Sequence, residues 1–255
     1  MNKLLTTLLV LAVASVTSVG YAQAAPAAAQ AAAAASQTAA PAAQASAAAP
    51  AKVAVAAPTA PTGAKTLDAK VAMCIGCHGI KGYQASFPEV HRVPMISGQS
   101  AKYIAAALNA YKTGDRKHPT MRGIADSLTE QDIADISAYY EKHGQTGEAL
   151  AATPSREPSP QVDALLKKAA CASCHGANLS KPIDPTYPKI AGQHADYMFV
   201  ALKAYKTENN PKVGRGNAIM AGMAKQYTNA ELKQLANYLA SVDGDLKTIP
   251  QKKFR

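Results

Sequence analysis

Each half of the chain carries two cysteines and a histidine in the pattern Cys-x-x-Cys-His. The first copy spans residues 74–78 and the second spans residues 171–175, and together they contain all four cysteines of the chain. On one turn of a helix, two thiols at this spacing reach the two vinyl groups along one edge of a porphyrin, and the next residue directs its imidazole at the iron. The pattern is the signature of covalent c-type haem attachment.

Other chemistries also use paired cysteines, namely a thioredoxin-like dithiol, a zinc site or a disulfide in an exported chain. A dithiol site normally follows a strand, and no window of this sequence shows the sustained alternation of a strand. The offset of 97 residues between the two copies is far from the spacing of a zinc ribbon. Two copies, each followed by His, predict two covalently bound haem c groups.

The similarity between the two halves continues well beyond the cysteines, with short insertions that shift the offset from 97 to 94 and then to 99. A repeat of this kind indicates two similar domains in tandem. The principal matches are Pro94, Ile96, Gly98, Gln99, Tyr103, Tyr111, Arg116, Met121, Thr129 and Tyr139 with Pro188, Ile190, Gly192, Gln193, Tyr197, Tyr205, Arg215, Met220, Thr228 and Tyr238.

The sixth ligand of each iron decides the function, because a filled axial position favours electron transfer and an open one permits ligand binding or catalysis. Met121 and Met220 are the candidates, and we expect them in loops just ahead of a capped helix. Their thioethers are soft ligands that raise the reduction potential of a His-ligated haem. The alternative is that each Met packs in a core. Met223 lies near Met220 but aligns with Ile124, so we expect it to pack.

Four histidines have no matching histidine in the other half, and we expect them at the surface or in loops. His118 needs separate attention, because it lies three residues before Met121 and imidazole also binds haem iron. The four are His91, His118, His143 and His194.

Two further matched pairs suit the surroundings of a haem. Pro94 and Pro188 each offer a carbonyl that can accept the second ring N–H of the ligating histidine, although a simple turn is the alternative. Arg116 and Arg215 precede the two methionines by five residues each. They are suited to pair with haem propionates, and the alternative is a solvated surface charge.

The secondary structure predicted for each half is helices joined by loops, so the fold class is all-α. Three capping signals are clear: a start at Thr66 or at Ser159-Pro160 ahead of the cysteines, a helix after Ser100 that stops at Gly114, and the patterns Thr129-x-x-Asp132 and Thr228-x-x-Glu231. Tyr139 and Tyr238 then lie on a helix face suited to core packing beside the haem.

Taken together, two Cys-x-x-Cys-His motifs, each followed by Pro-x-Ile-[Ser/Ala]-Gly-Gln, a Tyr-x4-Leu-x2-Tyr-Lys-Thr helix and a Met ahead of a capped helix, resemble the dihaem cytochrome c4 family. The resemblance covers about residues 65 to 248. It implies two class I cytochrome c folds related by a pseudo-twofold axis, in the periplasm, which pass single electrons from a quinol-oxidising complex to a terminal oxidase. Residue by residue, Cys74, Cys77, His78 and Met121 would hold the first haem, and Cys171, Cys174, His175 and Met220 the second.

The N-terminal part of the chain explains much of its composition. Residues 1–24 have the charged start, apolar run and Ala-x-Ala end of a cleaved signal peptide, with an uncleaved anchor as the alternative. Residues 25–64 form an Ala/Pro-rich linker that we expect to be disordered. We therefore expect the first domain at 65–146, a linker at 147–160 and the second domain at 161–255.

The charge is distributed unevenly between the halves. Residues 65–150 hold 10 basic and nine acidic side chains, and residues 151–255 hold 15 and eight. The basic second half suits an acidic docking face on a redox partner, an anionic membrane surface or nucleic acid, and export argues against nucleic acid. The sequence predicts a periplasmic electron carrier rather than an enzyme, soluble or tethered through its N-terminus. The alternative is an oxidoreductase, or its dihaem electron-transfer subunit, with one reactive haem.

Overall fold

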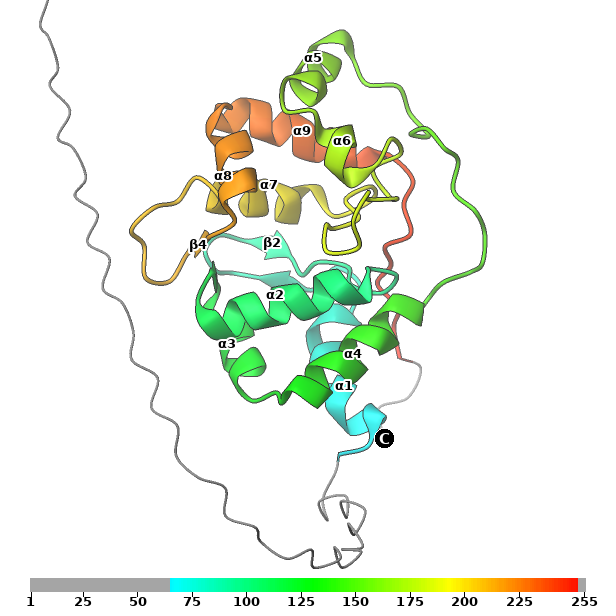
Figure 1. Ribbon diagram of the computed structural model, residues 1–255, viewed down its shortest axis with the longest axis vertical. Helices are drawn as coiled ribbons and strands as arrows, with labels where there is room; N and C mark the ends of the chain where they lie inside the picture. Colours follow the sequence, from blue (N-terminus) through cyan, green and yellow to red (C-terminus); the bar gives the residue numbers. More distant parts are fainter. Residues whose placement is uncertain (1–64, 252–255) are drawn as a thin grey trace, which may run out of the picture. The chain divides into compact units, whose positions relative to one another are not determined.

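The computed structural model describes residues 65–251, so the predicted signal peptide (1–24) and linker (25–64) lie outside the described residues. The described part is mostly helical with two small sheets, and it repeats one arrangement of helices twice (Figure 1). This agrees with the all-α class and the two tandem domains predicted from the sequence. Within residues 65–251 no helix is long and apolar enough to cross a membrane.

Helices α1, α2 and α4 of the first half begin at the capping residues seen in the sequence. The hydroxyl of Thr66 accepts a hydrogen bond from Ala69 N, and Thr129 forms a complete capping box with Asp132. The second helix ends at Gly114, whose φ of 86° is left-handed. These helices are α1 (Leu67–His78), α2 (Ala101–Thr113), α3 (Pro119–Asp126) and α4 (Glu130–Lys142).

The second half has the same order of helices with one interruption. Its helices are α5 (Pro160–Lys168), α6 (Cys171–His175), α7 (Ala195–Ala204), α8 (Ala218–Lys225) and α9 (Asn229–Ser241). Ser159 caps α5 and Thr228 forms a capping box with Glu231, as expected. Ala170 lies in the left-handed region at φ 46° and separates α5 from α6, whereas α1 runs unbroken through its cysteines. The second motif therefore has a short helix of its own.

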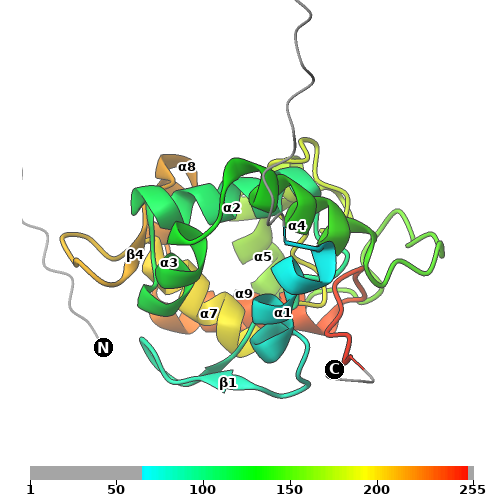
Figure 2. The same cartoon turned by 90° about the horizontal axis from the view of Figure 1, so that it is seen from below.

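Two small sheets were not expected from the sequence. The strands β1 (Gln84–Ala85) and β2 (His91–Arg92) form an antiparallel hairpin, and β2 packs against α7 of the second half (Figure 2). The strands β3 (Arg116–Lys117) and β4 (Gly214–Arg215) pair across the two halves, with Arg116 opposite Arg215. Strands of two residues are too short to show alternation, so sequence periodicity could not reveal them.

Each half has its own hydrophobic core. In the first half α1, α2 and α4 bury a cluster that includes Val71, Ile104 and Ile136. In the second half α7 and α9 bury Ala236 and Leu239, and α5 packs on the same helix α9. Burying a Val, Ile or Leu side chain contributes about 1.5–3 kcal/mol. These helices are therefore rigid supports for the residues on the connecting segments.

The C-terminal segment after Val242 leaves the second core and crosses to the first half. Lys247 N donates to Ser97 O at 3.0 Å in an isolated bridge, and Ile249 covers Gly144. Gly144 has a φ of 81°, and a Cβ there would collide with Ile249. We call residues 243–251 the C-terminal strap. It binds the two halves together in addition to the linker.

Candidate functional site

The histidine of each Cys-x-x-Cys-His motif is held by a proline carbonyl of its own half. The Nδ1–H of His78 donates to Pro94 O at 2.8 Å, and that of His175 donates to Pro188 O at 2.9 Å. Burial lowers the pKa of both rings, against the opposing effect of these hydrogen bonds. Each imidazole is therefore neutral, with its tautomer set, and presents Nε2 as the remaining donor atom for a metal.

The cysteines lie on the same helical turns as these histidines. Helix α1 carries Cys74 and Cys77, helix α6 carries Cys171 and Cys174, and none of the four is in a disulfide. Burial raises the pKa of Cys74 to about 11 and also raises that of Cys171. A reactive dithiol requires the opposite shift. Among residues 65–251 no three His, Cys, Asp or Glu side chains lie together in a way that could hold a metal ion.

The methionines Met121 and Met220 lie in short helices and not in the loops that the sequence suggested. Met121 is the third residue of α3 and Met220 the third of α8. The expectation was wrong because each helix is only eight residues long, which is too short for a clear helical periodicity, and because the cap of α3 is a histidine rather than one of the usual N-cap residues. Met121 is half-buried against the first core, and Met220 is half-buried as well.

His118 caps the helix that carries Met121. Its Nδ1 accepts a hydrogen bond from Met121 N at 3.4 Å, and at the matching place Asn217 Oδ1 accepts from Met220 N at 2.9 Å. The His118 ring also packs edge-on against Phe87, with the ring centroids 5.8 Å apart. Burial lowers the pKa of His118, which favours the neutral ring that can accept at Nδ1. The geometry gives His118 a capping role at the start of α3.

The two matched arginines meet where the halves join. Arg116 and Arg215 each donate to the hydroxyl of Tyr197, at 2.8 and 3.0 Å, and Arg116 also donates to Tyr103 at 3.3 Å. Neither guanidinium forms a salt bridge within the described residues, and Nε of Arg116 is buried without a hydrogen-bond partner there. They are thus not the solvated surface charges that the sequence left as an alternative.

At this interface two positively charged guanidinium groups bind the hydroxyl of one tyrosine, Tyr197. Burial raises the pKa of Tyr197, but the two neighbouring guanidinium groups outweigh it and bring the pKa down to about 8. For Arg116 and Arg215 burial lowers the pKa, while the surrounding tyrosines raise it, so both stay charged. A half-buried cationic pair of this kind is suited to bind anionic groups such as carboxylates.

The cytochrome c family model matches the chain twice, over residues 60–143 and 162–243. The cytochrome c4 of Stutzerimonas stutzeri is 30% identical over 188 residues, which cover 69% of this chain and 87% of that protein. This chain belongs to the cytochrome c4 family. The thiosulfate dehydrogenase electron acceptor of Thiomonas intermedia is 27% identical over 182 residues, covering 68% of this chain and 79% of that one. The solved structure of Acidithiobacillus ferrooxidans cytochrome c4 has a TM-score of 0.50 and 25% identity, covering 67% of this chain and 99% of that one.

As a cytochrome c4 with two cytochrome c domains, the chain binds two haem c groups covalently. Its residues fit that cofactor on two grounds. Each half offers a pair of thiols, an imidazole with a free Nε2 and a thioether, which is the donor set of a haem c site. The buried, unpartnered Nε of Arg116 also has the charge that a haem carboxylate requires.

Sequence reasoning missed two features of these sites. Tyr197 was matched to Tyr103 as a helix residue, but nothing in the pattern indicated that it takes both arginines. The paired Gln99 and Gln193 were used only as markers of the repeat, although each is 4% exposed. The signal that could have identified the two glutamines is a long polar side chain at the same position of both repeats. When such a side chain is buried, it needs hydrogen-bond partners.

Proposed function

We propose that this protein is a periplasmic carrier of single electrons between a respiratory donor complex and a terminal oxidase. In this proposal Cys74 and Cys77 attach the first haem, and His78 and Met121 are its axial ligands. Cys171, Cys174, His175 and Met220 do the same for the second haem. When bound, each haem supplies a one-electron iron couple.

The observation that carries the proposal is that each half holds a histidine and a methionine by separate, matching contacts. A proline carbonyl holds the imidazole ring, and the methionine lies in the first turn of a helix whose cap binds its N–H. Residues positioned in this way leave little to rearrange when an electron enters or leaves, and a filled sixth position excludes substrate. These properties suit a carrier and not an enzyme.

We further propose that Arg116 and Arg215 bind haem propionates at the junction of the halves. Their guanidinium groups are held by Tyr197 and face each other across the β3–β4 pair. Propionate binding would compensate charge that the described residues leave unpaired, and it would hold the two cofactors toward a common interface. We also propose the domain limits 65–146 and 161–255, and a leader at 1–24 that directs export.

The test of the carrier function is the visible spectrum of the dithionite-reduced protein, recorded before and after addition of carbon monoxide, with haem counted per chain. We expect two low-spin haems that do not react. A spectral change in either haem would show an open iron and contradict the proposal.

Docking should depend on charge, because the second half carries most of the excess of basic residues. We expect oxidase turnover with this protein to fall as ionic strength rises, since screening weakens the attraction to an acidic partner face. Turnover measured from low to physiological salt checks this. Salt-independent turnover would contradict electrostatic docking but not haem ligation.

A second candidate function is supported by two relatives. The Thiomonas intermedia protein is an electron acceptor of thiosulfate dehydrogenase, and we propose acceptance of electrons from a periplasmic oxidoreductase as the alternative to the respiratory donor. Stopped-flow reduction of the oxidised protein by each donor would distinguish the two. Turnover of thiosulfate by this chain alone would instead indicate one reactive haem.

A further inference from the structure

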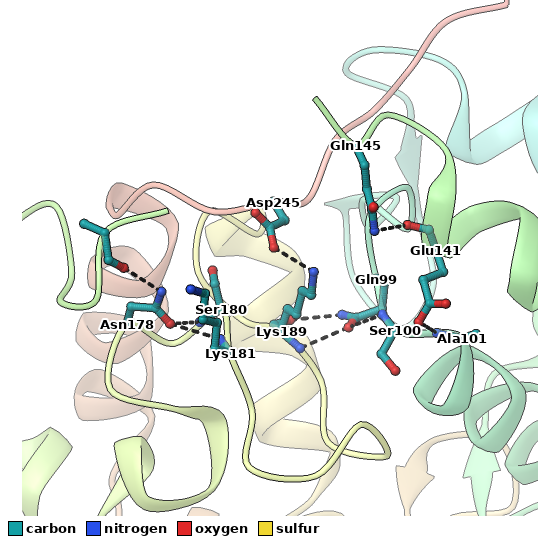
Figure 3. Close-up of polar contacts among 11 residues, drawn as sticks. Gln99, Ser100, Ala101, Glu141, Gln145, Asn178, Ser180, Lys181, Lys189 and Asp245 are labelled. Carbon is teal, nitrogen blue, oxygen red and sulfur yellow. Dashed lines mark hydrogen bonds and ion pairs between the residues drawn. The ribbon is translucent and has the colours of Figure 1, made fainter. Parts of the chain in front are cut away.

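The glutamines of the repeated motif, Gln99 and Gln193, each bind the main chain of the opposite half. The side-chain Nε2 of Gln99 donates to Lys189 O at 3.0 Å, and its Oε1 accepts from Lys189 N at 3.0 Å (Figure 3). Gln193 binds Met95 in the same way, at 2.9 and 3.0 Å. Because both side chains are buried, these contacts are well shielded from water.

The orientation of each carboxamide follows from its partners. Oε1 of Gln99 accepts a second hydrogen bond from Ser100 N at 3.0 Å, and Oε1 of Gln193 accepts one from His194 N at 3.0 Å. An amide nitrogen at the same place would face two N–H donors, so only one assignment satisfies the network.

The residues bound by the glutamines directly follow the prolines that hold the haem histidines. The N–H of Lys189 and the C=O of Pro188 belong to one peptide group, and that carbonyl accepts from His175 Nδ1. A continuous chain of hydrogen bonds therefore runs from His175 through this peptide group to Gln99. The mirror chain runs from His78 through the Pro94–Met95 peptide group to Gln193.

Hydrogen bonds in series polarise one another. When Gln99 accepts the N–H of Lys189, the carbonyl of Pro188 becomes a stronger acceptor for the His175 ring. A stronger bond at Nδ1 raises the basicity of the imidazole as a ligand, and a more basic ligand favours the oxidised iron.

We propose that each glutamine is a positioning residue for the haem of the opposite half. Gln99 lowers the reduction potential of the haem ligated by His175, and Gln193 lowers that of the haem ligated by His78. The inference rests on the proposed ligation by these histidines. In this proposal the interface does more than hold the halves together. Each half supplies a hydrogen bond that affects the reduction potential of the haem in the other half.

The experiment compares Gln99→Leu with Gln193→Leu in the full-length holoprotein. Leucine is close in size but cannot bind the peptide group. Redox titration is followed by paramagnetic proton NMR, in which each oxidised haem has its own shifted methyl signals. We expect Gln99→Leu to raise the potential of the second haem, and Gln193→Leu that of the first. The expected change in the reduction equilibrium is about threefold to tenfold, where tenfold corresponds to 59 mV for one electron.

Ser100→Ala is the matched control. Ser100 Oγ donates to Pro185 O at 2.6 Å, which is also a contact between the halves, but it does not touch the peptide group behind His175. We expect both potentials to stay unchanged. If Ser100→Ala shifts the second haem as much as Gln99→Leu does, general loosening of the interface explains the effect and the proposal is wrong.

The proposal predicts that each glutamine variant changes the potential of the haem in the opposite half, and this pattern distinguishes it from the alternatives. A shift confined to the haem of the mutated half, equal shifts in both haems, or no shift in either would each overturn it. If one variant does not fold, the other still decides, because each predicts a change in the opposite haem. A wild-type spectrum without His/Met ligation would instead contradict the proposed function, and this is established before any variant is titrated.

Discussion

The two halves of this cytochrome c4 present the same chemical groups by different local means. Helix α1 runs unbroken to His78, whereas the second half breaks its helix at Ala170 before His175. A histidine caps the helix of Met121 and an asparagine caps that of Met220. The histidine contacts and the capped methionine helices thus occur in both halves, while the residues that support them differ.

The halves also differ in what holds their terminal helices together. In the first half Lys70 of α1 binds Asp132 and Asp135 of α4, at 2.9 and 2.5 Å. In the second half the hydroxyl of Tyr227 donates to Leu165 O at 2.7 Å, and Lys167 pairs with Asp163 on its own helix. The comparison shows that the contacts between the first and last helices differ from one half to the other, and it suggests variants that affect one half only.

The largest effect is expected from removal of one sixth ligand. Met121→Ala should make the first haem reactive to carbon monoxide and leave the second closed, and Met220→Ala should do the reverse. Carbon monoxide titration of the reduced protein would then show one reactive haem per chain in each variant. Met223→Ala is the control, because it changes a neighbouring methionine on α8 and should leave both haems closed. A reactive haem in Met223→Ala would mean that the ligand has been assigned to the wrong residue.

The next largest effect is expected on the free energy of unfolding when either of the two arginines is replaced. Arg116 binds two tyrosines and Arg215 binds one of them. A hydrogen bond to a charged group contributes about 1.5–3 kcal/mol, so Arg116→Leu should destabilise the protein roughly twice as much as Arg215→Leu. Denaturant unfolding of the holoproteins measures the free energies. Equal losses would show that the bond to Tyr103 contributes nothing.

The same pair of variants should change the titration of Tyr197. Its pKa of about 8 in the folded protein lies below the ordinary value of about 10, so its contribution to stability is complete above about pH 10 and is lost as pH falls through 8. Either leucine variant removes one guanidinium and should move the pKa up toward 10. Ultraviolet titration of tyrosinate detects this, and Tyr197→Phe identifies the signal.

A smaller effect is expected at the two caps. His118→Ala should cost about 1 kcal/mol because α3 loses its N-cap acceptor, whereas His118→Asn installs the residue that caps α8 and should cost less. Denaturant unfolding gives both values. In each variant the near-infrared band of ferric iron bound to methionine should persist. Its loss in His118→Asn would indicate that this histidine, and not Met121, ligates the iron.

The smallest effect is expected in acid. Hydrogen bonds from Lys70 and Thr129 lower the pKa of Asp132 to about 2, so the contact between α1 and α4 is complete above about pH 4 and is lost as pH falls through 2. NMR signals of α1 and α4 should broaden in this range before those of α5 and α9. Lys70→Met should remove the difference. If the signals of both halves broaden at the same pH in the wild-type protein, the expected difference between the halves is contradicted.

The sequence predicted the local features of this molecule well. The starts of α1, α4, α5 and α9 were confirmed because an N-cap and its partner lie three residues apart, so a short window contains the whole interaction. The two haem c groups were predicted for the same reason, since one helical turn carries both thiols and the imidazole. The assignment of Met121 and Met220 as ligands stays a prediction.

Features that depend on both halves could not be predicted. Arg116 and Gln99 acquire their partners only when residues about 80 to 100 positions away arrive beside them. From its residue type alone, Arg116 is equally compatible with a solvated surface charge, and Gln99 with a residue in a turn. The placement of Met121 in a helix was missed for a local reason, because histidine is an uncommon N-cap and gave no start signal.

The C-terminal strap has a consequence for the order in which the chain can complete its fold. Ser97 lies early in the first domain, but its main-chain partner Lys247 is almost the last described residue. Contacts of such sequence separation form late, because the loop between them must close first. The first domain is therefore synthesised first, but its contact with Lys247 can form only after the rest of the chain has been made. A chain truncated after Val242 should keep both cores yet fold its first domain into a looser and more readily proteolysed state.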